Sequence, residues 1–260
     1  MGCSVKDNMA PTLEWLQRRL ELDDAGLRKV VLGLPPLLGL SIEDNLAPKL
    51  QWLQTRLELD AEQLRKMVLR LPPLLSLSVE DNLAPKLDWL QDRLDLDAAQ
   101  LNKMVLRLPA VLGLSVEDNM APKLDWLQTR LDLDEGQLRK FLLRLPSVLG
   151  LSVEDNLAPT LEWLQTRLDL DESGLRKMVL VRPQLLGYSV EDNLAPTLDW
   201  LQKRLDLDDL GLRKMVLTFP SLLSLSVEDN MEPKLGFFEQ ELGLSASEVR
   251  ASIVSAPARL

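Results

Sequence analysis

The stretch LRKMVLRLPPLLSLSVEDNLAPKLDWL, residues 64–90, decides the fold, because similar copies of it recur along the chain every 37 residues. Taking the Ser of the Ser-Val-Glu-Asp-Asn run as the first position, units start at Ser4, Ser41, Ser78, Ser115, Ser152, Ser189 and Ser226. A fixed period of this length is the signature of a repeat protein, in which each unit stacks on its neighbours. We therefore expect one array over residues 1–260, with the truncated seventh unit as its C-terminal cap.

Two prolines divide each unit into helices. Pro occupies positions 8 and 32 of every unit, as Pro85 and Pro109 do in the unit that starts at Ser78. Because Pro is tolerated in the first turn of a helix and breaks its interior, we expect a helix A from position 8 to about position 17. Position 20 is Asp in six units and Ser245 in the seventh. Such a side chain caps a second helix, helix B, which runs to the residue before the next Pro.

The Ser-Val-Glu-Asp-Asn-Leu run before helix A is predicted to form a short turn or a 3₁₀ segment capped by its Ser. A single helix kinked at the Pro is the alternative. Each unit then consists of a helix, a second helix and a short connecting turn, so the predicted fold is all-α, an α-solenoid.

Apolar residues recur at helical spacing in both helices, which predicts one buried face on each. The residues of these faces in one copy are Leu64, Met67, Val68 and Leu71 for helix B, and Leu83, Leu87, Leu90 and Leu94 for helix A. The Trp at position 12 lies off the helix-A face. A helix with a neighbour on both sides needs a second apolar surface, so we expect this Trp to pack between units.

Composition excludes several classes of protein. The chain has no His and one Cys, so His acid–base catalysis, a Cys-His nucleophile and the usual zinc sites are excluded. We expect no enzyme activity, no cofactor and no metal. Charges or Pro interrupt every Leu-rich run, so no membrane association is expected, and we expect a monomer. Met1-Gly2-Cys3 resembles an N-terminal lipidation motif. Gly2 and Cys3 fall on positions 36 and 37 of a preceding unit, so we interpret them as the remnant of a repeat and not as a lipidation site.

Cations concentrate on helix B, although the net charge is −10. Position 26 is Lys in six units and position 30 is Arg in three, and the two positions lie on one side of the helix, away from its apolar face. The candidate phosphate contacts are Lys66, Arg70, Lys103, Arg107, Lys140 and Arg144, extended by Lys29, Lys177 and Lys214. Position 25 adds a second set of arginines on a flank of the same helix.

This basic stripe has two interpretations. It either contacts nucleic-acid phosphates, with salt-dependent and largely sequence-independent affinity, or it is a solvated helix face whose cations complement the helix dipole. On helix A, positions 9, 12 and 16 form a mixed stripe, such as Lys86, Trp89 and Arg93. It could stack bases, but we interpret it as an inter-repeat Trp covered by the Arg stem in a cation–π contact.

The acidic residues lie mainly in the turns, on helix A and in the interhelical loop, as Glu80, Asp81, Asp88, Asp95 and Asp97 do. A site repeated seven times without a pocket is not an active site, so we assign these residues to capping, dipole complementarity and solubility. The Asn at position 5 is assigned to hydrogen bonds with nearby backbone groups.

The quoted stretch resembles the mitochondrial transcription termination factor (mTERF) family, through a Pro followed by Leu-Leu and then Ser-Val-Glu-x-Asn-Leu-x-Pro-Lys-Leu-x-aromatic-Leu. The pattern recurs in essentially every unit. The resemblance implies a superhelical array of helix–helix–3₁₀ repeats whose basic concave groove holds double-stranded nucleic acid. It also implies a role in organellar transcription or its termination.

We therefore expect a non-enzymatic module that binds double-stranded DNA or structured RNA. The alternative is a protein-interaction scaffold, or a duplicated or designed repeat array without nucleic-acid affinity, which the acidic charge and the near-identical units favour. Location in a mitochondrion or chloroplast follows from the resemblance only. The chain shows no transit peptide, so a cytoplasmic location is expected if the sequence is full length.

Overall fold

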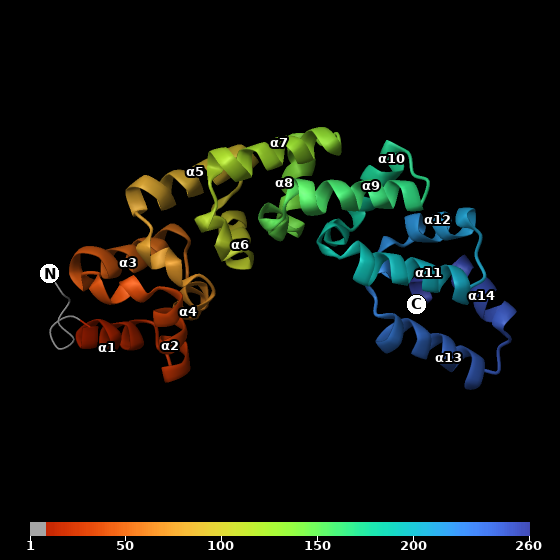
Figure 1. Cartoon of the computed structure of the whole chain (residues 1–260), viewed down its shortest axis with the longest axis horizontal. Helices are drawn as coiled ribbons and strands as arrows, with labels where there is room; N and C mark the ends of the chain where they lie inside the picture. The colour runs from red at the N-terminus through yellow and green to blue at the C-terminus, as the bar shows by residue number, and fades with distance from the viewer. Residues whose placement is uncertain (1–8) are drawn as a thin grey trace. The chain divides into compact units, whose positions relative to one another are not determined.

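The computed structural model describes residues 9–260, and these residues form helices without any strand (Figure 1). Gly2 and Cys3, which the sequence assigns to the remnant of a repeat and not to a lipidation signal, lie outside the described part of the chain. The first helices of the repeats are α1 (Ala10–Arg19), α3 (Ala47–Arg56), α5 (Ala84–Leu94), α7 (Ala121–Arg130), α9 (Ala158–Arg167), α11 (Ala195–Arg204) and α13 (Glu232–Gln240). The second helices are α2 (Asp24–Gly33), α4 (Ala61–Arg70), α6 (Ala98–Arg107), α8 (Glu135–Arg144), α10 (Glu172–Val181), α12 (Asp209–Thr218) and α14 (Ala246–Ser255).

Two kinds of short helix complete each repeat. A 3₁₀ helix follows each second helix, beginning at the position-32 Pro: η2 (Pro35–Gly39), η4 (Pro72–Ser76), η6 (Pro109–Gly113), η8 (Pro146–Gly150), η10 (Pro183–Gly187), η12 (Pro220–Ser224) and η14 (Pro257–Arg259). A π-helical turn precedes helix A from the second repeat onward: η3 (Ile42–Leu46), η5 (Val79–Leu83), η7 (Val116–Met120), η9 (Val153–Leu157), η11 (Val190–Leu194) and η13 (Val227–Met231). The predicted all-α solenoid of helix–helix–3₁₀ repeats is confirmed.

The helix boundaries follow the proline and Asp pattern. Helix α3 has Pro48 in its first turn and ends at Arg56. The side chain of Asp60 accepts a hydrogen bond from the backbone N–H of Gln63, and the Gln63 side chain accepts one from the backbone of Asp60. This reciprocal capping box satisfies two of the N–H groups that the start of a helix leaves free. Helix α4 then ends at Arg70, one residue before the C-cap that precedes Pro72.

The prediction of a separate turn or 3₁₀ segment before helix A is wrong. The Leu46 N–H donates to the Ser41 carbonyl, five residues earlier, and the chain continues in helical geometry through Ala47 into α3. Ser41 caps this segment as predicted, accepting from the Asp44 N–H at 3.0 Å. In an uninterrupted α-helix the Pro48 ring would collide with the carbonyl four residues earlier. The wider π turn avoids that collision, so the alternative of one helix modified at its Pro is closer to the structure.

A left-handed residue separates the two helices of every described repeat. Position 18 has φ between +46° and +51° in the first six repeats, where it is Glu or Asp, and Gly243 has φ +65° in the seventh. Left-handed backbone is costly for a residue with a side chain and is usual for Gly at a helix C-terminus. An acid kept at this position therefore requires another reason, which the contacts between repeats provide.

The buried core consists of the predicted apolar faces. Leu64, Met67 and Val68 of α4 are buried, and Leu71 is half-buried. The helix-A set is buried in full: Leu83, Leu87, Leu90 and Leu94. The 3₁₀ helices add a further pair in most repeats, such as Leu74 and Leu75. Each repeat thus buries a Leu-rich layer between its own helices and those of the next.

Contacts divide the chain into two compact units, residues 1–128 with 133–150 and residues 129–132 with 151–260. In the first unit, second helices of successive repeats pack together, α2 on α4 and α6 on α8. In the second unit, 3₁₀ helices of successive repeats pack together, η10 on η12. Among residues 9–260, no helix has both the length and the apolar character needed to cross a membrane.

The caps give a direct test of this account of the repeat. Asp97 accepts from the Gln100 N–H at 2.7 Å, so we expect Asp97→Ala to lower the free energy of unfolding by about 0.5–2 kcal/mol. Asp92→Ala, which removes an exposed carboxylate near the end of the same repeat's helix A, is the matched control. Urea unfolding of both variants measures the difference. Equal stability of the two variants would contradict the assignment of Asp97 as a cap.

Candidate nucleic-acid interface

The predicted site residues all lie exposed on second helices. Position 26 falls in the middle of helix B and position 30 falls at its last turn, both opposite the residues that pack into the core. The exposed cations are Lys29, Lys66, Lys103, Lys140, Lys177 and Lys214 at position 26 and Arg70, Arg107 and Arg144 at position 30. The face that carries them is called the helix-B basic face below.

The arginines of the helix-B basic face form contacts within the protein. Arg70 donates to the carbonyl of Leu106 at 3.1 Å, and Arg107 donates to that of Leu143 at 3.0 Å, so each joins its helix to the second helix of the next repeat. Arg144 is also engaged in an interaction. These contacts place α4, α6 and α8 side by side, with their exposed cations on neighbouring helices.

Most lysines of the helix-B basic face are free. Lys66 pairs with Glu62 one turn earlier, at 2.6 Å. The ammonium groups of the other five form no hydrogen bond or ion pair with any residue in the 9–260 range: Lys29, Lys103, Lys140, Lys177 and Lys214. Position 22, the equivalent of Glu62, carries no acid in the repeats of these five lysines. Uncompensated ammonium groups therefore recur on second helices within each compact unit: Lys29, Lys103 and Lys140 in the first, and Lys177 and Lys214 in the second.

The neighbouring arginines at position 25 have a different use. Where a preceding repeat exists, such an arginine pairs with its left-handed acid: Arg176 with Asp132 at 2.7 Å, Arg213 with Asp169 at 2.6 Å and Arg250 with Asp206 at 2.7 Å. Arg139 pairs with Asp95 in the same way, and Arg65 lies 3.9 Å from Glu21. This contact explains the acid at position 18, because a Gly there would leave the arginine without its carboxylate.

A second row of arginines links the first helices. Arg93 donates to Asp125, Gln128 and Glu135 of the next repeat, at 3.2, 2.9 and 2.7 Å. Equivalent bonds run from Arg56, Arg130, Arg167 and Arg204 into the following repeat. Hydrogen bonds from Gln128 and Arg93 lower the pKa of Glu135 below its ordinary value. With the exception of the exposed Arg28 in the first repeat, the arginines of positions 16 and 25 therefore serve contacts between repeats and are not available to a ligand.

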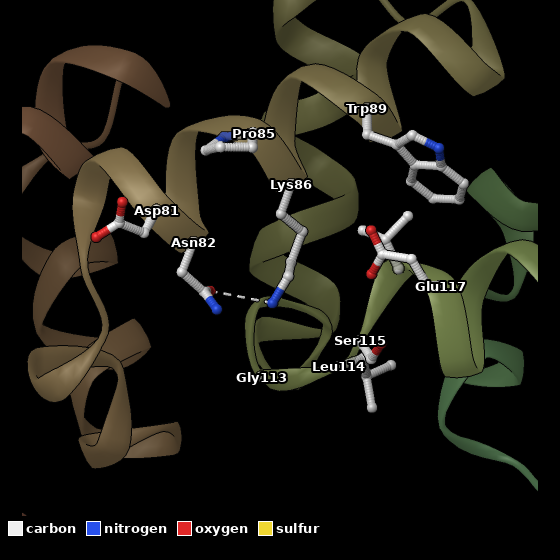
Figure 2. A pocket seen from close by; sticks show the side chains of 10 residues that line it. Asp81, Asn82, Pro85, Lys86, Trp89, Gly113, Leu114, Ser115 and Glu117 are labelled. Atoms are coloured by element: carbon white, nitrogen blue, oxygen red, sulfur yellow. Dashed lines mark hydrogen bonds between the residues drawn. The ribbon is translucent and has the colours of Figure 1, made fainter.

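Lys86 of the mixed helix-A stripe is buried and structural. Its ammonium donates to the Leu112 carbonyl at 2.5 Å. It also donates to the Asn82 side chain at 3.1 Å, the bond drawn in Figure 2. Lys49 makes the same two bonds, and burial lowers the pKa of both lysines. The Asn at position 5 thus bonds a lysine rather than only the backbone. The Oδ1 atoms of Asn193, in a repeat with Thr197 at the lysine position, and of Asn230, in a repeat that keeps Lys234, are buried without a partner among the described residues.

The predicted cation–π contact of the helix-A stripe is not found among the described residues. Arg93 extends toward the next repeat instead of covering Trp89, because three side-chain oxygen acceptors of that repeat bind its guanidinium. The position-12 Trp residues are half-buried in all six repeats that have one. In this stripe the Lys joins helix A to the 3₁₀ helix of its own repeat, and the Arg joins its repeat to the next, while the Trp keeps part of its surface open.

Sequence reasoning missed the role of position 18. The single signal was Gly243, which occupies that position in the seventh repeat and is the residue that left-handed backbone favours. Sequence reasoning also did not separate the position-25 arginines from the candidate lysines beside them on helix B. The structure separates them, because the acid that holds each arginine lies 44 residues earlier in the chain.

A comparison with known families supports the repeat assignment. The model of the mTERF family matches residues 1–134 and residues 128–260, which together span the chain. No curated protein matches the chain.

The third repeat tests the ion pairs between repeats. Asn102 occupies position 25 there and donates to the carbonyl of Leu57, so Glu58 has no arginine. We expect Asn102→Arg to raise the free energy of unfolding by about 0.2–1 kcal/mol, the usual range for an exposed ion pair. The gain should shrink in high salt and in a Glu58→Gln background. An unchanged gain in that background, measured by urea unfolding, would show that the pair does not form.

Proposed function

The chain belongs to the mTERF family, and on this premise we propose that it is a non-enzymatic repeat protein that binds double-stranded DNA or structured RNA through the helix-B basic face. The observation that carries the proposal is the set of five lysines without partners. Nearly every other cation of the first and second helices is fixed by an acid or a carbonyl. Lys29, Lys103, Lys140, Lys177 and Lys214 are left to bind an external anion.

The spacing of these lysines suits a phosphate backbone. Packed helices lie about 8–10 Å apart, and the axial rise between phosphates on one DNA strand is about 3.4 Å. Lysines on neighbouring second helices would therefore reach phosphates two or three nucleotides apart. Near-identical lysines offer no pattern of donors and acceptors that reads base edges, so the proposed binding is largely independent of sequence.

The acidic net charge is compatible with this proposal because the acids have other positions. The left-handed acids pair with arginines, and those at positions 3 and 4 lie in the π turns. Acids at the start of helix B cap it or complement its dipole, as Asp134 and Glu135 do. The overall negative potential should weaken binding at a distance and make it sensitive to salt.

The proposed setting is transcription or its termination in a mitochondrion or chloroplast, which the family membership supports. We propose no catalytic role, because the chain lacks His and its carboxylates serve caps and ion pairs. The competing proposal, a protein-interaction scaffold without nucleic-acid affinity, draws on the acidic net charge.

Removing two lysines tests the function directly. For Lys103→Ala/Lys140→Ala we expect weaker binding to a labelled DNA duplex, and a plot of log affinity against log salt whose slope falls by about 1.8, since each lost phosphate contact accounts for roughly 0.9. The control Arg18→Ala/Lys203→Ala removes two exposed helix-A cations and changes the total charge equally. Fluorescence anisotropy at several salt concentrations measures both.

Absence of duplex and RNA binding by the unmodified protein at low salt would overturn the proposal and favour the scaffold. Equal loss of affinity in Lys103→Ala/Lys140→Ala and in the control variant would show that only net charge matters, which would also contradict a role for the helix-B basic face.

A further inference from the structure

A cleft recurs at the same place in three of the repeats. In each case the position-12 Trp of one repeat faces the aliphatic residue and the Glu at positions 2 and 3 of the next. The three sets are Trp15 with Ile42 and Glu43, Trp89 with Val116 and Glu117, and Trp200 with Val227 and Glu228. Neither the core nor the helix-B basic face uses these residues.

The middle cleft shows how the parts lie (Figure 2). Trp89 projects from α5 toward the segment that carries Glu117, and Lys86 lies between Glu117 and Asn82. The ammonium of Lys86 is held by Asn82 and the Leu112 carbonyl. This cleft therefore combines an indole face and a carboxylate with a cation already fixed in its lining.

The C-terminal cleft is the most acidic of the three. It contains Glu228, Glu232 and Glu241 and no Lys or Arg. Glu232 is held by Arg204, whereas the carboxylates of Glu228 and Glu241 have no hydrogen bond or ion pair within residues 9–260. Phe237 adds a second aromatic ring whose exposed fraction is 53%.

A glycine leaves this cleft open. Gly236 occupies position 11, which carries Asp, Glu or Gln in the other repeats. A Cβ atom added at Gly236 would meet no atom within 4 Å, so packing does not require Gly there. Gly within a helix also lowers its stability relative to Ala. The residue thus widens the space between Trp200 and Phe237 at a cost to α13.

We propose that this C-terminal cleft binds Lys or Arg side chains of an extended basic protein segment. The methylene stem would lie on the Trp200 and Val227 surface, and the cationic head would meet the aromatic rings and the carboxylates of Glu228 and Glu241. Nucleic acid does not fit, because the unpaired carboxylates of Glu228 and Glu241 repel phosphate. The proposal is independent of nucleic-acid binding by the helix-B basic face, since the two surfaces share no residue.

Fluorescence anisotropy with a labelled peptide of alternating Lys and Ala tests this site on the full chain. We expect binding that the matching Glu-Ala peptide does not show. Glu228→Gln/Glu241→Gln should raise the Kd about fivefold or more. Gly236→Leu, which fills open space, should abolish binding, and a circular dichroism spectrum confirms that each variant is folded.

The control variant Glu58→Gln/Asp92→Asn removes two exposed acids outside the three clefts, so it changes the net charge by the same amount. It should leave the Kd within twofold of the unmodified protein. Equal weakening in this control would reduce the effect to general attraction by an acidic protein and overturn the site. Equal competition by single-stranded DNA would overturn it as well.

Discussion

The array depends on the junction at which helix A ends and the next repeat docks. The backbone there adopts a left-handed conformation, which sets the turn between the two helices. The same residue carries the carboxylate that receives the position-25 arginine of the following repeat, as Asp132 receives Arg176. One residue thus fixes the local turn and the contact between repeats. Because such exposed pairs are individually weak, their contribution is register between repeats, while the buried leucines supply most of the stability.

The cations of the protein fall into two classes, those that bind adjacent repeats at this junction and those that face solvent. The paired arginines of positions 16 and 25 lie against acids and glutamines of adjacent repeats, and their side chains are about one quarter to two fifths exposed. Lysines of position 26 lie one residue further along helix B and point to solvent. The net charge of −10 therefore does not describe any one surface. Most acids lie in ion pairs, caps and turns, whereas the position-26 lysines lack a compensating acid. The family membership supports the ligand proposed for that series, and the acidic C-terminal cleft at Trp200 is proposed to bind a different one.

Much of the fold could be predicted because its signals are local. The prolines, the capping Asp residues and the helical spacing of Leu each act within a few residues of the structure they determine. The π turn before Pro48 was not predictable, because an i−5 bond leaves no distinct residue pattern. The burial of Lys86 depends on a carbonyl 26 residues away, and the ion pair of Arg139 on an acid 44 residues away. In a repeated sequence, every such partner exists in several equivalent copies, so the sequence alone does not select one. The exposure of the candidate lysines followed from helical periodicity, but their lack of partners did not.

The central claim is that the position-26 lysines bind a ligand, whereas most other cations form contacts within and between repeats. Lysine acylation followed by mass spectrometry, with and without a DNA duplex, tests this claim in one sample. The account predicts that the duplex protects Lys103, Lys140, Lys177 and Lys214 and leaves the exposed helix-A residue Lys203 fully reactive. Uniform protection of all five lysines, or protection of Lys203 alone, would contradict it.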